Sequence, residues 1–424
     1  MTVDDTRRDP GIPVAAGREE RSPDPRFVPI PPEAEERSSD PRFVPIPPEA
    51  EERFSDSRFV TIPPEAEEAL PPADTVTGKL GRAFFRRLPV WPLVEFLSKK
   101  KVPRHRHSFW YTIGSMALFF LVVQIVTGVL LMVYYSPSQP WSSVQRIVME
   151  IPFGGLLRSI HHWSANLMLL ALFVHLFSTF FMKAYRPPRE LTWLTGLALL
   201  GTTMFLGFSG YLLPWDDLSF FATRVGISEL EKMPLLGTWI AGLARGGPDV
   251  TVDTIGRFYP LHVVVLPLLL LAVLSVHLFF VQVQGVSEPD SFRALPPEQK
   301  RYHRFFSEYL VNEIPIWMAL AALLVALSAL FPRVLAPEAD PAAAAPEGIK
   351  PEWYFMVPFQ MLKLFPGSLE LLGMALTGLI PVLFLVVPFV DRSVPADRRG
   401  RVATRVGVAF LVYLVAMTVW GMVS

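Results

Sequence analysis

Seven long apolar segments alternate with polar stretches between residues 109 and 423. They cover residues 109–135, 159–182, 191–213, 258–286, 314–331, 371–390 and 406–423, each at least 18 residues long and nearly free of charge. A helix needs about 20 apolar residues to cross the hydrocarbon core of a bilayer, where it satisfies its own backbone polar groups. The pattern therefore predicts an all-α, polytopic membrane protein with about seven transmembrane helices.

Basic side chains are concentrated in alternate loops. Clusters of Lys and Arg occur at residues 99–104, 183–189, 293–304 and 392–401. With seven crossings all four clusters fall on one side of the membrane, which the positive-inside rule assigns to the cytoplasm. We therefore expect a multi-pass protein, in a membrane such as the bacterial cytoplasmic membrane, with a cytoplasmic N-terminus. The C-terminus and the loops at 214–257 and 332–370 are then outside.

Residues 1–77 follow a different pattern, that of a Pro- and Glu-rich repeat. Three copies of a 16-residue unit stand in tandem at 21–36, 37–52 and 53–68. Each copy has one Phe-Val pair, which is too little apolar surface to form a core. We predict a disordered tail. It is either a solvated linker or a docking segment whose Phe27, Phe43 and Phe59 bind a partner.

Composition changes this picture in two ways. The formal net charge is +0, but residues 1–74 hold 18 acidic and 9 basic side chains, which leaves 21 acidic and 30 basic for the rest. An acidic tail thus precedes a basic, apolar body, and the basic and aromatic residues of 79–107 predict a helix lying on the membrane surface. The chain has no cysteine, which excludes disulfides, iron–sulfur ligation and thioether attachment of haem within it.

Histidines carry the candidate chemistry. Five of the eight lie in the second and fourth predicted spans: His161, His162, His175, His262 and His277. An ionisable residue inside a span is costly, so a functional role is the default interpretation. The 14 steps from His161 to His175 leave them about 40° apart on the helix and about 21 Å apart along it; the 15 steps from His262 to His277 give about 60° and about 22 Å. His162 lies about 140° from His175 and is expected to point elsewhere.

This spacing predicts two His–iron–His sandwiches stacked across the bilayer, between the second and fourth spans. Two imidazoles on each iron leave no open coordination position, which suits electron transfer. A packing role explains one histidine more easily than two matched pairs. A zinc or proton transporter would place carboxylates in the same spans, and the first four spans contain none.

Glycines repeat at the same interval in the first and third spans. Gly114 and Gly128 are 14 residues apart, and so are Gly196 and Gly210. Missing side chains at two depths would let a flat macrocycle approach these helices. Close helix packing is the alternative reason for glycine in a membrane helix.

Four strings resemble the cytochrome b subunit of bc- and bf-type complexes. They are RSIHHWSANLMLLALFVH at 158–175, GYLLPWDD at 210–217, RFYPLHVVVLPLLLLAVLSVH at 257–277 and PEWY at 351–354. The PEWY form and the 15-step pair resemble the photosynthetic bf type, in which the protein is split; here both parts are joined near 286–312. The resemblance implies an N-terminal domain at 78–286 with a four-helix bundle and two non-covalent b haems, and a three-helix C-terminal domain at 287–424.

The same resemblance implies roles for individual residues. His161 and His262 would bind the low-potential haem near the outer face, and His175 and His277 the high-potential haem. Arg158 and Arg257 would hold haem propionates, a role that suits guanidinium donors. Thr112 stands where the bf type has the cysteine that attaches an extra haem, so that attachment is not expected. The basic residue that follows the last histidine in the bf type is also missing, and we assign no residues to the cytoplasmic-side quinone site.

The PEWY segment is implied to line a quinol-oxidising pocket facing the loop 214–257. Glu352 is the expected proton acceptor, because a carboxylate at the edge of a low-dielectric pocket can have its pKa raised towards neutral. Pro351 restricts the backbone before it, while Trp353 and Tyr354 can wall a ring pocket and donate hydrogen bonds. Two aromatics from the third span and the loop after it, Tyr211 and Trp215, either line the opposite wall or pack at the interface.

The function implied is oxidation of membrane quinol, with electrons crossing between the haems and protons released outside. Expected partners are a Rieske-type iron–sulfur protein as a separate chain, a c-type cytochrome or plastocyanin-like acceptor, membrane lipid and a second copy within the complex; no nucleic acid is expected. A di-haem membrane anchor of another respiratory dehydrogenase is the alternative, but it would lack the PEWY loop. A transporter or a purely structural subunit is the alternative from another class.

Overall fold

The computed structural model describes residues 72, 74–87, 96, 100–391 and 398–424. It divides into two units, Met1–Trp91 and Pro92–Ser424. In the first unit the described element is helix α4 (Val76–Arg87). The three repeats lie outside the described residues, so the disordered tail and its docking phenylalanines stay predictions.

Seven helical segments of the described residues are long and apolar enough to cross a membrane. They are Ser108–Tyr134, Gly154–Phe181, Glu190–Tyr211, Val252–Gln284, Leu310–Leu330, Gly367–Val390 and Arg401–Val423. The main helices in them are α6 (Thr112–Tyr134), α8 (Gly154–Phe181), α9 (Glu190–Tyr211), α13 (Leu266–Gln284), α15 (Leu310–Leu330), α17 (Glu370–Val390) and α18 (Arg398–Val423). The prediction of an all-α, seven-span fold is confirmed.

Several boundaries differ from the sequence pattern, and two of the differences change the contacts between elements. The fifth span begins at Leu310 instead of residue 314, which brings Glu313 into the helix, where it is buried and accepts a hydrogen bond from Ser115 of α6. The expected surface helix over 79–107 is interrupted, because Lys101–Pro103 forms a short strand, β1, that pairs with β2 (Tyr302–Arg304). Backbone pairing between two distant segments is invisible to a local pattern.

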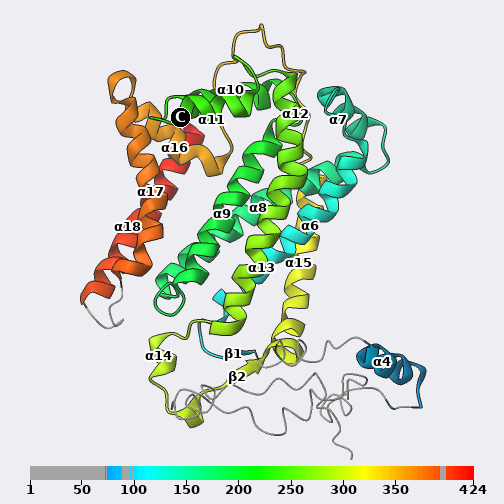
Figure 1. Cartoon of the computed structure of the whole chain (residues 1–424), viewed down its shortest axis with the longest axis vertical. Helices are drawn as coiled ribbons and strands as arrows, with labels where there is room; N and C mark the ends of the chain where they lie inside the picture. Colours follow the sequence, from blue (N-terminus) through cyan, green and yellow to red (C-terminus); the bar gives the residue numbers. More distant parts are fainter. Residues whose placement is uncertain (1–71, 73, 88–95, 97–99, 392–397) are drawn as a thin grey trace, which may run out of the picture. The chain divides into compact units, whose positions relative to one another are not determined.

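The helices pair in a way that sets the two histidine helices opposite each other. Helix α6 packs against α8, and α9 packs against α13, while α15 contacts both α6 and α8. Figure 1 shows α6, α8, α9 and α13 running alongside one another, with α17 and α18 on the far side of α9. Apolar residues fill the space between α6, α8 and α15, including Phe120, Met168 and Leu324.

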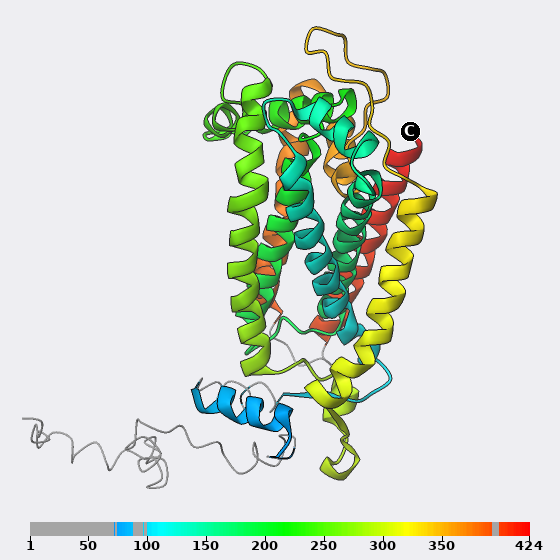
Figure 2. The same cartoon turned by 90° about the vertical axis from the view of Figure 1, so that its right-hand side faces the viewer.

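The loops gather at two opposite ends of this second unit. One end holds β1, β2 and α14 (Asp290–Arg293); the other holds α7 (Pro140–Met149), α10 (Asp217–Glu231), α11 (Gly237–Arg245) and α16 (Met356–Leu364), as Figures 1 and 2 show. The loops 214–257 and 332–370 thus share one end, as the charge pattern predicts. Which end faces the cytoplasm stays a prediction.

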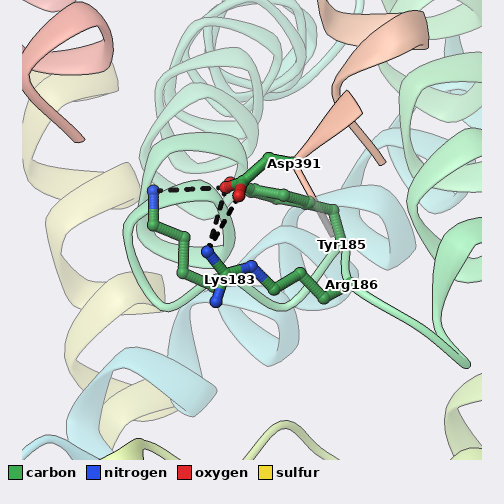
Figure 3. A network of polar contacts seen from close by, with 4 residues as sticks. All are labelled: Lys183, Tyr185, Arg186 and Asp391. Atoms are coloured by element: carbon green, nitrogen blue, oxygen red, sulfur yellow. Dashed lines mark hydrogen bonds and ion pairs between the residues drawn. The ribbon is translucent and has the colours of Figure 1, made fainter. Parts of the chain in front are cut away.

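A polar network joins the C-terminal helices to the N-terminal ones at the β-strand end (Figure 3). Asp391, at the end of α17, accepts hydrogen bonds from Arg186 at 3.0 and 3.1 Å and from the hydroxyl of the fully buried Tyr185. Lys183 lies 3.9 Å from the same carboxylate. Both cations belong to the loop between α8 and α9, so this carboxylate fixes α17 to that loop.

Candidate functional site

Two pairs of histidines face each other between α8 and the fourth span. His161 and His175 lie on α8, His262 lies in the short helical segment η3 (Leu261–Val265), and His277 lies on α13. His161 is near enough to His262 to interact electrostatically, and His175 is likewise near His277. The structure therefore brings together the two pairs that the sequence spacing pointed to.

A π-helical turn explains how two different spacings produce matching pairs. Residues 261–265 form this turn, directly after Pro260, the last residue of α12 (Val252–Pro260). A π turn inserts one extra residue without advancing the helix face as an α-helical residue does. His262 lies within this turn, so the 15 residues from His262 to His277 rotate less than 15 residues of a regular helix would, which brings the two side chains closer to one face.

Each of the four glycines lies against one histidine ring. A Cβ built on Gly114, Gly128 or Gly196 would stand 3.2, 3.3 or 3.4 Å from Cε1 of the facing imidazole, and one on Gly210 only 2.5 Å from it. The facing rings are, in that order, His175, His161, His277 and His262. The glycines of α6 thus seat the histidines of α8, and those of α9 seat the histidines of the fourth span. Their expected contact with a macrocycle stays a prediction.

Hydroxyl groups lie within hydrogen-bond distance of Nδ1 in three of these rings. Nδ1 of His161 lies 2.8 Å from the hydroxyl of Thr127, and Nδ1 of His277 lies 3.1 Å from that of Thr195. Nδ1 of His262 lies 3.2 Å from the hydroxyl of Ser209 and 3.1 Å from the Leu206 carbonyl. A partner on Nδ1 leaves Nε2 as the coordinating nitrogen, which is how histidines that bind metal are usually oriented. The donor set and its orientation therefore fit two bis-imidazole haems.

The two arginines expected to hold propionates differ in burial and in their hydrogen-bond partners. Arg158 lies near the N-terminal end of α8, beside Arg333, and donates to the Arg333 carbonyl at 2.7 Å. Arg257 is exposed and donates to the Leu243 carbonyl at 2.9 Å, at the end of α11. Arg158 is thus the better placed of the two, and the propionate role of either stays a prediction.

Arg333 is a residue that the sequence did not point to. Its backbone N–H donates to Ser159 at 3.0 Å, and its guanidinium contacts the Tyr211 hydroxyl and lies near Glu352. It belongs to an irregular loop, where no periodic signal exists. Only the docking of that loop on α8 places it at the site.

The loop before PEWY is fixed to the preceding half of the chain by its backbone. Asp217 donates its N–H to the Pro337 carbonyl at 3.0 Å, and Ala339 donates to the Trp215 carbonyl at 3.1 Å. Trp215 itself is 4% exposed and packs on Phe220, so it is a packing aromatic. These bonds tie the first part of the 332–370 loop to the segment that follows α9.

PEWY forms a compact corner in which each side chain has a definite neighbour. Trp353 donates its indole N–H to Asn166 of α8 at 2.8 Å. The Tyr354 hydroxyl lies over Gly207 of α9, where an added Cβ would stand 2.9 Å from it. Pro351 and Glu352 precede this short turn (Trp353–Phe355) and are half-buried. The two aromatic residues thus hold this segment against α8 and α9.

Burial raises the pKa of Glu352, and the nearby charge of Arg333 opposes that rise. Tyr211 and Tyr354 both lie within electrostatic range of the Glu352 carboxylate. Burial also raises the pKa of Tyr354 well above its usual value, so this phenol stays protonated and can donate. A carboxylate with a raised pKa is a stronger base towards a bound hydroxyl group, and the charge of Arg333 favours its ionised form.

The remaining histidines lie away from the two pairs. His162 stands beside Asn166, with Nε2 3.4 Å from its amide nitrogen, as expected for a ring off the His161 face. His105, which lies before α6, is half-buried and pairs with the Tyr111 hydroxyl at 2.8 Å. Burial and the neighbouring His107 lower the pKa of His105.

Comparison with known proteins agrees with this architecture. A family model described as "Cytochrome b/b6/petB" matches residues 97–285, and one described as "Cytochrome b(C-terminal)/b6/petD" matches residues 338–424. A cytochrome bc complex cytochrome b subunit from Chlorobaculum thiosulfatiphilum is 45% identical over 331 residues, 77% of this chain and 77% of its own length.

Three further similarities cover different shares of the chain. Cytochrome b6 of Heliobacterium mobile is 39% identical over 206 residues, 48% of this chain and 97% of that protein. The menaquinol:cytochrome c reductase cytochrome b subunit of Geobacillus thermodenitrificans is 38% identical over 212 residues, 48% of this chain and 95% of that protein. A solved structure titled "Hyperthermophilic respiratory Complex III" matches with a TM-score of 0.67 at 28% identity, over 80% of this chain and 89% of that one.

The structure has seven spans, and the second and fourth carry two facing pairs of histidines that lie against glycines. This is the architecture of a multi-pass membrane cytochrome of the b type. The chain belongs to the cytochrome b family of bc- and b6f-type quinol:cytochrome c reductase complexes. The N- and C-terminal family regions occur here in one polypeptide, as expected for the fused form.

Proposed function

We propose that this protein is the quinol-oxidising, di-haem subunit of its complex. The observation that carries the proposal is the presence of two pairs of facing histidines at two levels of one helix bundle. Each of the four rings lies against a glycine. His161 and His262 would hold one b haem, and His175 and His277 the other. Bound there, the haems supply one-electron redox chemistry, and the protein's part is placement.

The PEWY corner supports a quinol pocket at the end of the bundle nearest the His161–His262 pair. A quinol ring needs an apolar wall, a hydrogen-bond donor and a proton acceptor. The aromatic side chains of Trp353 and Tyr354 supply the first two, and the half-buried Glu352 carboxylate supplies the third. Glu352 would take a proton from a quinol hydroxyl and release it to the nearby end of the molecule.

The partners follow from what this chain lacks and what its site does. With no cysteine in the sequence, the acceptor of the first electron would be an iron–sulfur protein on a separate chain. A c-type cytochrome or similar carrier would accept that electron next. The positively charged loop end would face the cytoplasm, and a second copy of the chain would complete the complex as a homodimer.

A redox-titrated visible spectrum of the purified complex tests the proposal. We expect two bis-imidazole b haems per cytochrome b chain, which titrate in two separate steps. Substituting His161 or His262 should remove one step, and substituting His175 or His277 should remove the other. A single haem, or one whose spectrum survives loss of its assigned histidines, would refute the assignment.

Glu352→Gln tests the proton acceptor. We expect quinol oxidation to fall steeply, and its pH dependence to lose the limb that reports ionisation of the carboxylate, with both haems retained. Glu347→Gln, an exposed carboxylate of the same loop, is the matched control and should behave as wild type. Unchanged turnover and pH dependence in Glu352→Gln would remove Glu352 from the mechanism.

A further inference from the structure

Three of the four glycines that lie against a histidine ring are preceded by a residue with a hydroxyl group, and the fourth is not. Thr127, Thr195 and Ser209 precede Gly128, Gly196 and Gly210, and their hydroxyls are the Nδ1 partners described above. Before the fourth glycine, Gly114, stands Ile113, which is 6% exposed. Nδ1 of the facing ring, His175, is buried and has no hydrogen-bond partner among the described residues. Three axial histidines thus have a hydroxyl partner, and one does not.

His175, His161 and His277 sit against their glycines in a similar way, while His262 lies closer to Gly210, whose added Cβ would stand 3.0 Å from its Nδ1. A Cβ built on the facing glycine would lie 3.6 Å from Nδ1 of His175, against 3.9 Å for His161 and 3.8 Å for His277. Because these three rings sit against their glycines in a similar way, residue 113 stands to His175 as Thr127 stands to His161. The missing hydrogen bond therefore follows from the identity of one side chain, an isoleucine in place of a threonine or serine.

A hydrogen-bond acceptor for Nδ1–H changes the basicity of Nε2, the coordinating nitrogen. When that N–H donates a hydrogen bond, the ring gains imidazolate character and becomes a more basic ligand. A more basic ligand stabilises ferric iron more than ferrous iron, so hydrogen bonding behind the ligand is one of the protein's means of setting a haem potential. An imidazole without an acceptor leaves the ferrous form relatively more stable.

We infer that Ile113 is a positioning residue that raises the reduction potential of the haem held by His175 and His277, by denying His175 a hydrogen-bond acceptor. The inference rests on the proposed function, since it assumes that both histidine pairs hold haem. It gives a cause, in this chain's own side chains, for the difference in reduction potential between the two haems. The pair that includes His161 has hydroxyl partners on both rings, and the pair that includes His175 has one on only one ring.

Ile113→Thr tests this, with Ile113→Val as its matched control. Threonine and valine have the same β-branched shape, and only threonine offers an oxygen to Nδ1. In membranes holding the complete complex, we expect Ile113→Thr to shift the reduction equilibrium of one haem towards the ferric form by up to about tenfold, a fall of ~59 mV for a one-electron couple. Ile113→Val should leave both potentials at the wild-type values.

The reciprocal variant makes the test independent of how well Ile113→Thr assembles. Thr127→Val removes the partner of His161 and should raise the potential of the other haem, so the two variants must move different steps of the titration in opposite directions. Equal potentials in Ile113→Thr and Ile113→Val would overturn the inference, as would a Thr127→Val titration that shows no rise. A wild-type complex without two haems would instead refute the proposed function, so the two failures are distinguishable.

Discussion

Replacing Gly210 with alanine introduces a single methyl group at the tightest contact between α9 and a histidine. The added Cβ would stand 2.5 Å from Cε1 and 3.0 Å from Nδ1 of His262. Carbon atoms pack best at about 3.5–4.0 Å, so the overlap is ~1 Å, and the neighbour is a ring that iron coordination would hold in place. The ring or the helix must move.

Overpacking of this kind costs about 1–3 kcal/mol, which corresponds to a roughly 5- to 150-fold loss in the population of the coordinating geometry. We therefore expect Gly210→Ala to lose most of the haem at the His161–His262 site while the other site stays filled. Gly196→Ala should be milder, because its Cβ would lie 3.4 Å from the facing ring. Gly201→Ala is the control on the same helix, since an added Cβ there meets nothing within 4 Å.

The assay is haem content per chain, combined with a redox titration that separates the two haems. Gly201→Ala should retain both haems, Gly196→Ala should retain most of both, and Gly210→Ala should lose one. Two full haems with wild-type potentials in Gly210→Ala would refute the view that glycine is needed there to seat the ring. Equal damage from Gly201→Ala would show that any methyl group on α9 disturbs the bundle.

Two further substitutions change charges, one at the PEWY corner and one at the opposite, β-strand end of the bundle. Arg333→Gln removes the charge that lowers the pKa of Glu352, so that pKa should rise and the acid limb of quinol oxidation should move to higher pH; an unmoved limb would contradict this. Asp391→Asn removes the buried carboxylate charge that faces the largely buried Arg186 at 3.0 Å, which should cost about 3–5 kcal/mol. Thermal unfolding of the solubilised complex measures this loss of stability. The control is Glu370→Gln, which removes an exposed ion pair worth about 0–1 kcal/mol.

The sequence alone determined the features that depend on local spacing and composition. Runs of about 20 apolar residues can be stable only as membrane helices, so the seven spans follow from the pattern. The 14-residue intervals of histidines and glycines match the helical period, so the spacing itself defines the helix face on which each set lies. The absence of cysteine by itself excludes whole classes of cofactor attachment, because those attachments require a thiolate.

Tertiary structure decided what depends on contacts between distant segments. His262 lies in a π turn, which changes its angle to His277 and which the 15-step spacing cannot reveal. Arg333 and Asp391 reach their partners only because an irregular loop and a helix end dock on α8 and on the loop that follows it. The pairing of Gly114 with His175, and so the meaning of Ile113, depends on which helices pack together. Such contacts are set by packing between elements, on which the periodicity within a single element carries no information.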